Sequence, residues 1–260
     1  MSASGSLKVV SLPVCALNVR LVDALWRLYS DHYDNVVREV FEADLANKQS
    51  VFVGFDGGSG EVKGFSTAVI YFHRYGGRTV GVYFSGDTIV HPDYWGQKAL
   101  HKRVLRALLV WRLRHPLIPL YWFLICSGYR TYLTMVRTFP DHWPHHAGEL
   151  PPWERGLIDS LGRERFGDAW KSERGVVSSA GPQAVVKRRV APFTAQVLAL
   201  PEIQFFVRAN PGCERGDELA VIGRVNAAAY GRFALKLLRR WTRGLGLGAA
   251  LPGRTGVSPR

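Results

Sequence analysis

A strand-like segment that runs directly into a basic, helix-like segment lies between residues 86 and 115. It reads GDTIVHPDYWGQKALHKRVLRALLVWRLRH, with Asp87 in the strand-like part and Pro92 at the change of pattern. A strand that turns directly into a helix exposes unpaired backbone N–H groups, and the helix dipole makes that point attractive to anions. We therefore expect a pyrophosphate or a similar anion to bind at this turn.

Polar and basic side chains follow the turn and could reinforce anion binding. They are Gln97, Lys98, His101, Lys102 and Arg103. Cationic side chains make charge-assisted hydrogen bonds to phosphate, and near a helix start an anion would relieve their repulsion by the dipole. The alternative interpretation is a solvated basic face.

Hydrophobic periodicity predicts the elements that hold this turn. Apolar residues three or four apart indicate helices over residues 18–33 and 34–48, with Asn18 as an N-cap of the first. Glycine-rich turns separate the next three β-rich runs, as is typical of an antiparallel meander. These runs span residues 49–56, 62–73 and 78–90. A helix from about Trp95 to Arg114, a buried strand over 120–126 and a short helix over 129–139 follow, so we expect a mixed α/β domain.

From the sequence after residue 140 we expect an extension over residues 141–243 that packs on the first domain. We expect a flexible basic tail over residues 244–260. A helix is expected from near Pro152, and two strand-like runs around a long turn are expected over 202–225. A basic helix from about Asn226 to Arg243 is expected to dock through a stripe made of Tyr230, Phe233, Leu237, Leu238 and Trp241. The alternative for this helix is contact with an anionic membrane surface.

The element order and the sequence VHPDYWGQKAL together resemble the GNAT superfamily of N-acyltransferases. The family pattern at its fourth strand and third helix is roughly V-x-P-x-Y-R-G-x-G-x-G/A, and Val90, Pro92, Tyr94 and Gly96 are in register with it. The phosphate loop is degenerate, because Trp95, Lys98 and Leu100 replace the family's arginine and last two small residues. The resemblance covers residues 7–139.

This resemblance implies a fold and a site. Residues 1–140 would form a GNAT-like domain whose fourth and fifth strands splay apart, with helices on both faces of the sheet. The backbone of Ile89 and Val90 would pair with the pantetheine arm of the donor. The remaining donor-binding residues would be Trp95, Gly96, Gln97, Lys98, His101, Lys102 and Ser127.

The resemblance also implies an N-acyltransferase that moves an acyl group from acyl-CoA or an acidic acyl carrier protein to a small-molecule amine. Such a reaction needs a base for the incoming ammonium and an acid for the departing thiolate. Asp87 is the candidate base or amine-binding group, and Tyr129 or Tyr132 is the candidate acid. The structural alternatives are that Asp87 satisfies a turn or bulge and that Tyr132 packs in the core.

Composition restricts the class of partner. The chain has 260 residues, a net charge of +13 and three cysteines without CxxC spacing. The charge implies an acidic partner, and the cysteines favour a reducing cytoplasm over a disulfide framework. No signal sequence or membrane-length apolar run is present, so we expect a cytoplasmic protein with possible peripheral membrane contact through the basic helix. A non-enzymatic protein that binds an anionic membrane or nucleic acid is the alternative function, with nucleic acid less favoured.

Three histidines in the sequence HWPHH raise the question of a metal. His142, His145 and His146 are potential ligands, but no carboxylate or thiol stands at a suitable spacing. From the sequence we therefore expect no metal. Motifs of P-loop NTPases, α/β-hydrolases, zinc proteases and dinucleotide-binding enzymes do not occur.

Overall fold

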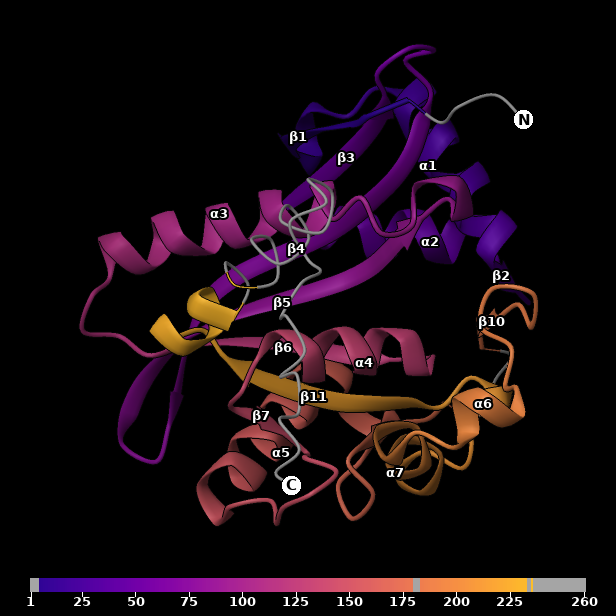
Figure 1. The fold of residues 1–260 in the computed structure, drawn as a ribbon. Coiled ribbons are helices and arrows are strands. Elements are labelled where there is room, and N and C mark those ends of the chain that lie inside the picture. The colour runs from indigo at the N-terminus through magenta and orange to yellow at the C-terminus, as the bar shows by residue number, and fades with distance from the viewer. Residues whose placement is uncertain (1–4, 180–182, 233–234, 236–260) are drawn as a thin grey trace, which may run out of the picture.

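A large mixed β-sheet organises the molecule, whose computed structural model describes residues 5–179, 183–232 and 235 (Figure 1). The strand order is β1-β3-β4-β5-β6-β11-β9-β8, and β7 also pairs with β11. The bounds are β1 (Leu7–Pro13), β3 (Ser50–Asp56), β4 (Val62–Tyr75), β5 (Arg78–Val90), β6 (Leu120–Cys126), β7 (His142–Trp143), β8 (Trp170–Lys171), β9 (Val176–Val177) and β11 (Glu218–Arg224). Neighbouring strands are antiparallel except β5 and β6, which are parallel, so the predicted meander and mixed α/β class are confirmed. A separate pair joins β2 (Tyr33–Asp34) to β10 (Val185–Val186).

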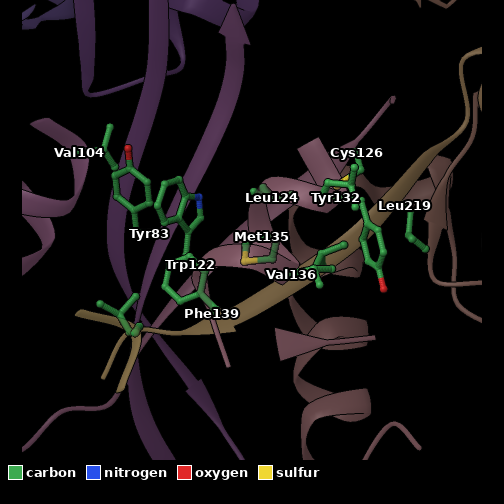
Figure 2. Packing of buried hydrophobic residues seen from close by; sticks show 14 of the residues in the cluster. Tyr83, Val104, Trp122, Leu124, Cys126, Tyr132, Met135, Val136, Phe139 and Leu219 are labelled. Atoms are coloured by element: carbon green, nitrogen blue, oxygen red, sulfur yellow. The ribbon is translucent and has the colours of Figure 1, made fainter. Parts of the chain in front are cut away.

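Helices cover both faces of this sheet. Their bounds are α1 (Val19–His32), α2 (Arg38–Ala46), α3 (Ala99–Arg114), α4 (Tyr129–Thr138), α5 (Pro152–Phe166), α6 (Ala195–Leu198) and α7 (Pro201–Ala209). Side chains alternate along each strand, so Tyr121 and Phe123 pack with α5 while Leu120 and Trp122 pack with α3, α4 and α7. On β3, Val51 and Val53 pack instead with α1 and α2. The alternation divides the interior into three cores, of which Figure 2 shows the one beneath α4.

Several predicted elements differ from those observed. The helix expected from Trp95 begins four residues later, because Gly96 and Lys98 adopt positive φ angles of 88° and 62° and delay the first helical residue to Ala99. The run after residue 201 is α7 and not a strand. Pro201 suits the first turn of a helix, and Ile203 and Phe206, three residues apart, are fully buried on one face.

Three apolar residues within the helices predicted from hydrophobic periodicity are exposed. Val37 and Val40 are 53% and 67% exposed because α2 begins at Arg38 and turns Phe41 and Leu45 toward the core. Leu109 on α3 is 40% exposed, whereas its neighbour Leu108 is buried. Hydrophobic residues next to the buried stripe of a helix therefore misled the sequence interpretation.

The start of the basic C-terminal helix is tied to the sheet. Asn226 caps it as expected, since its Oδ1 accepts from the Ala229 N–H at 3.0 Å and its Nδ2 donates to Asp141 at 2.7 Å. Tyr230 packs against the α3 side of the core. The expected docking residues Phe233, Leu237, Leu238 and Trp241 and the tail over 244–260 lie outside the described residues. Within the described ranges, no helix has the length and apolar character needed to cross a membrane.

The proposed division at residue 140 stays a prediction. Strand β11, from the expected extension over 141–243, pairs along β6 from Leu219↔Cys126 to Arg224↔Tyr121. The extension therefore contributes a strand to the same sheet as the first 140 residues. This placement brings Glu218 to the end of β6.

Candidate active site

Strands β5 and β6 separate halfway along β5. Their parallel pairing runs from Gly81↔Leu120 to Ser85↔Leu124, whereas β5 stays paired with β4 as far as Gly64↔Val90. Beyond Ser85, β6 instead follows β11, and the two halves of the sheet diverge (Figure 1). These two strands are the fourth and fifth of the main sheet in chain order, because β2 belongs to a separate sheet. The splay that was predicted between the fourth and fifth strands is therefore present.

A β-bulge sets the position of Asp87 at the start of this splay. Ala68 pairs with Ser85 and Ser66 pairs with Thr88, so Gly86 and Asp87 together oppose Thr67. Gly86 suits the bulge because a Cβ there would lie 2.5 Å from Thr67 Oγ1 and 2.7 Å from Lys48 Cε. The extra residue interrupts the regular alternation of β5 just before Asp87.

A cavity of about 1150 Å³ fills the splay and is bordered by both halves of the sheet. Asp87 and Thr88 line it from β5, Trp122 and Leu124 line it from β6, and Glu218 lines it from β11. Residues that precede or begin α3 and α4 also border it, among them Trp95, Gly96, Lys98, His101, Ser127, Gly128 and Arg130. The structure thus brings most of the predicted site residues to one cavity.

Two carboxyl groups in this cavity have strongly raised pKa values. Burial raises the pKa of Asp87 to about 7, the nearby Asp44 and Glu218 raise it further, and Lys48 opposes them. Burial also raises the pKa of Glu218 to about 7, against a hydrogen bond from Ser127 that lowers it. The charge of Glu218 is one of the causes that raise the pKa of Asp87, so the two carboxyl groups interact. A carboxyl group with this pKa can exchange a proton near neutral pH.

Ser127 links Glu218 to a tyrosine of the N-terminal helical segment. Its hydroxyl donates to Glu218 Oε1, and Tyr33 is hydrogen-bonded to Ser127. Burial raises the pKa of Tyr33 well above its usual value, and the charges of Asp87 and Glu218 act in the same direction. Tyr33 therefore keeps its proton at neutral pH and borders the cavity as a proton donor.

A buried lysine lies next to the bulge that carries Asp87. Lys48 forms an ion pair with Asp44, and its side chain is 1% exposed. Its ammonium also donates to the Asp44 carbonyl at 3.2 Å and lies over the Phe84 ring. These contacts hold the Lys48 charge beside Asp87. That charge lowers the pKa of Asp87, but less than burial raises it.

Cationic groups and two helix starts surround the other end of the cavity. Lys98 immediately precedes α3 and Gly128 immediately precedes α4. The Arg130 guanidinium lies 4.2 Å from the centre of the Trp95 ring, and His101 stacks on Trp122. This end combines helix dipoles with positive charge, which suits a phosphate-bearing ligand.

Two residues predicted to contact the acyl donor already form hydrogen bonds within the protein. Gln97 does not border the cavity among the described lining residues, because its amide accepts from Leu7 N at 2.8 Å and donates to Gly5 O at 3.0 Å. Its side chain therefore holds β1 beside the turn. Ile89 and Val90 border the cavity as predicted, although the Val90 carbonyl accepts from the Trp95 indole at 2.7 Å and the Ile89 side chain packs in the core beneath α1. Lys102 is exposed one turn along α3 and also lies outside the described cavity lining.

The two predicted catalytic tyrosines are core residues. Tyr132 is fully buried, stacks on Phe205, and donates to the Pro144 carbonyl at 3.2 Å. Figure 2 shows it between Val136 and Leu219. Tyr129 is also buried, and its hydroxyl donates to the Pro192 carbonyl at 3.1 Å. The role of thiolate acid predicted for them is therefore corrected, since both side chains point into the packing between α4 and the C-terminal segments.

Sequence reasoning missed Glu218, Tyr33, Lys48 and Arg130 as site residues. Glu218 stands at the start of the apolar run ELAVIGR, and an acid at the start of a buried strand is a weak signal. Its partner Ser127 is 91 residues away along the chain. The pairing of β11 with β6 makes them neighbours, and a single sequence does not reveal that pairing.

Comparisons with known proteins return solved structures at low sequence identity. No protein-family model and no curated protein matches the sequence. A GCN5-related N-acetyltransferase from Kribbella flavida is 15% identical, covers 52% of this chain and 35% of its own, and gives a TM-score of 0.36. A probable N-acyltransferase from Enterococcus faecalis is 11% identical, covers 83% of this chain and 65% of its own, and gives a TM-score of 0.41. An aminoglycoside N-acetyltransferase in complex with CoA is 15% identical over 53% of this chain and 88% of its own, with a TM-score of 0.38.

The sheet itself decides the fold class. The sheet has the antiparallel strands β1, β3, β4 and β5, a parallel β5–β6 pair that opens beyond Ser85, and helices on both faces. This is the architecture that the sequence resemblance implies. The fold is GNAT-like. Relative to that core, β11 adds a strand that supplies Glu218 to the GNAT-like splay.

Proposed function

We propose that the chain is an N-acyltransferase that moves an acyl group from a phosphopantetheine thioester to an amine. The observation that carries this proposal is the pair Asp87 and Glu218, whose carboxyl groups border the splay with pKa values of about 7. Acyl transfer to an ammonium needs a base that is ionised at neutral pH and still able to hold a proton. Ordinary exposed carboxylates are too weakly basic for that task.

The reaction follows from these groups. The Asp87 carboxylate, or Glu218 as its coupled partner, takes a proton from the ammonium of the acceptor. The free amine attacks the thioester carbon, the C–N bond forms, and the C–S bond breaks. After the attack, the nitrogen gives its second proton to the carboxylate of the pair that is still ionised. Tyr33 donates a proton to the departing thiolate and regains one from the protonated pair through Ser127 and Glu218. The proton that remains on the pair passes to solvent. The products are an amide and a free thiol.

The donor is proposed to enter between β5 and β6 with its phosphate end at Lys98, Arg130 and the start of α4. Beyond Ser85 the described β5 residues no longer pair with β6, which leaves room for an extended pantetheine arm. The cavity is at the upper end of the usual size for ligand pockets and carries aromatic walls at Tyr29 and Phe84. Acyl-CoA and an acyl carrier protein present the same arm, and the net charge of +13 suits the acidic surface of a carrier.

The test is a donor and acceptor screen read by mass spectrometry. The full chain is incubated with acetyl-CoA, longer acyl-CoAs or an acyl carrier protein, each with a panel of primary amines, and acylated amines are measured. Mass detection is preferable to a thiol reagent because Cys15 is exposed and would react. Asp87→Asn should cut turnover about a hundredfold while donor affinity changes little. Absence of any acylated product with every donor, or an active Asp87→Asn, would contradict the proposal.

A non-enzymatic role in binding anionic membranes or nucleic acid is the alternative from the sequence. It rests mainly on the basic residues after 235, which lie outside the described residues. A melting-temperature screen separates the two functions, because a ligand that binds the native state raises the melting temperature. CoA should raise it, whereas anionic vesicles and DNA should not.

A further inference from the structure

A cluster of three histidines lies beside the sheet in the segment that follows α4. His142 belongs to β7, which pairs with β11 at His142↔Gly223, and His145 and His146 follow in the adjoining loop. One ring nitrogen of each histidine lies within 4.8 Å of those of the other two. The ring centres of His142 and His145 are 4.4 Å apart, and those of His145 and His146 are 4.6 Å apart.

Two nitrogens in this cluster are buried without a partner among the described residues. His142 is 2% exposed, and its Nδ1 lies 2.8 Å from the Phe139 carbonyl, to which it donates. The Nε2 lone pair of His142 is then unsatisfied, and so is Nδ1 of His146. A buried polar atom without a partner costs free energy, so such atoms call for a ligand or another explanation.

His142 has the second hydrogen bond that is typical of a metal-binding histidine. Histidines that bind metal commonly donate their second nitrogen to a backbone carbonyl, which fixes the ring and the tautomer. The Phe139 carbonyl does this for His142. The loop is fixed in turn by Tyr132, whose hydroxyl donates to the Pro144 carbonyl. Tyr132 thus has a structural role beside this cluster.

The other two imidazoles are partly exposed and can adjust. Tetrahedral zinc with bonds of about 2.0–2.1 Å to nitrogen places its ligand atoms roughly 3.3 Å apart, closer than the limit of 4.8 Å seen here. His145 and His146 would have to rotate toward His142. In doing so, His145 Nδ1 would exchange its 3.0 Å contact with the Ala147 N–H, an exposed hydrogen bond, for metal or water.

A metal binds the neutral form of an imidazole. Burial lowers the pKa of His142 to about 4, and His145 and His146 lower it further. Burial also lowers the pKa of His145, as do His146 and the cation Arg232. Arg232 carries a positive charge near the cluster and therefore repels a metal cation. Replacing Arg232 with a neutral residue would favour metal binding.

We propose that His142, His145 and His146 form a binding site for one divalent transition-metal ion, with zinc as the best match. Three imidazole nitrogens suit zinc, copper or nickel, and they leave a fourth position for water or another ligand. The sequence predicted no metal because it showed no carboxylate or thiol at suitable spacing. The fold brings the three imidazole rings together, which their spacing in the sequence did not indicate. The site is independent of the acyl-transfer cavity, which is lined by other residues.

The test is calorimetric titration of the full chain, without a histidine tag, with Zn²⁺. Wild type should bind one Zn²⁺ per chain, and His145→Ala and His146→Ala should each weaken binding at least tenfold. His115→Ala is the matched control, because His115 packs on Trp111 away from the cluster and should leave affinity unchanged. All titrations are made in a Cys15→Ser background, since this exposed thiol could bind zinc by itself.

Folding is monitored so that loss of structure is not read as loss of a ligand. The partly exposed His145 and His146 are changed rather than the buried His142, and the metal-free melting temperature of each variant should stay near that of wild type. Co²⁺ should give the intense visible absorption of a tetrahedral site in wild type and lose it in both variants. The proposal is overturned if wild type binds no zinc, if His115→Ala weakens binding as much as His145→Ala, or if neither cluster variant changes affinity.

Discussion

The Ser127 hydroxyl donates a hydrogen bond to the Glu218 carboxylate and so joins the end of β6 to the start of β11. This contact connects residues 91 positions apart and places an acid at the mouth of the splay. The hydrogen bond favours the ionised form of Glu218, whereas burial favours the protonated form. Burial prevails, and the pKa of Glu218 stays near 7.

Removing this hydrogen bond should move the acidic limb of the pH–rate profile. With Ser127→Ala the ionised form of Glu218 loses a donor, so its pKa should rise, and kcat/KM should fall off about one pH unit higher than in wild type. Measurement of kcat/KM from pH 5 to 9 checks this. Ser30→Ala is the control, since its hydroxyl donates to the Arg27 carbonyl within α1 through an exposed hydrogen bond. An unmoved limb in Ser127→Ala would assign the titrating base to Asp87 rather than Glu218.

Asp87 should make the stability of the protein depend on pH. The folded carboxyl holds its proton up to about pH 7, whereas the unfolded one releases it near 3.8, so the folded state binds more protons between these values. Stability contributed by this group is therefore complete below pH 4 and is lost as pH rises through 7. Asp87→Asn removes this loss, and its melting temperature relative to wild type should increase by roughly 6–12 °C between pH 4.5 and pH 8, or about 3 kcal/mol.

The control for this comparison is Asp168→Asn, which changes an exposed aspartate outside the described cavity lining. Its melting temperature relative to wild type should stay constant over the same pH range. If Asp87→Asn behaved in the same way, Asp87 would be ionised in the folded state at every pH tested. Its proposed role as a neutral-pH base would then fail as well.

Tyrosine variants separate the proposed proton donor, Tyr33, from the tyrosines predicted from the sequence. Tyr33→Phe should lower kcat at least tenfold, because it removes the hydroxyl bonded to Ser127 at the cavity. Tyr132→Phe should leave kcat within about twofold but cost about 1 kcal/mol of stability through the lost bond to Pro144. Steady-state kinetics and urea unfolding measure the two effects. The reverse pattern would restore Tyr132 as the acid.

The sequence predicted those parts of the molecule that depend on local pattern. The meander, the buried strand at 120–126 and the strand-to-helix turn follow from alternation, glycine turns and Pro92. The position of Asp87 also followed, because it belongs to the strand that forms one wall. Glu218 and Tyr33 could not be predicted, since they reach the cavity through the pairing of β11 with β6 and the contact of an N-terminal segment with Ser127.

The errors have a common physical cause. Tyr129 and Tyr132 have the residue type that an acid requires, but the buried face of an amphipathic helix and its functional face look alike in one sequence. The same holds for Gln97, whose amide satisfies the backbone of β1. The three histidines show the converse, because poor ligand spacing along the chain gave no indication that their nitrogens converge in space.

The donor end of the cavity can be tested with two lysines on the same helix start. Lys98 borders the cavity just before α3, whereas Lys102 is exposed one turn later and outside the described cavity lining. A phosphate at the start of α3 would contact Lys98 directly. Its electrostatic attraction to Lys102 would act through solvent, where salt screens it. Lys98→Glu should therefore weaken CoA binding at least tenfold, on the order of 1.4 kcal/mol, and Lys102→Glu should weaken it less than threefold. Calorimetric titration with CoA at two salt concentrations measures both. Equal weakening by the two variants, reduced in parallel by salt, would mean that CoA senses only the overall basic field and that its phosphates lie away from this turn.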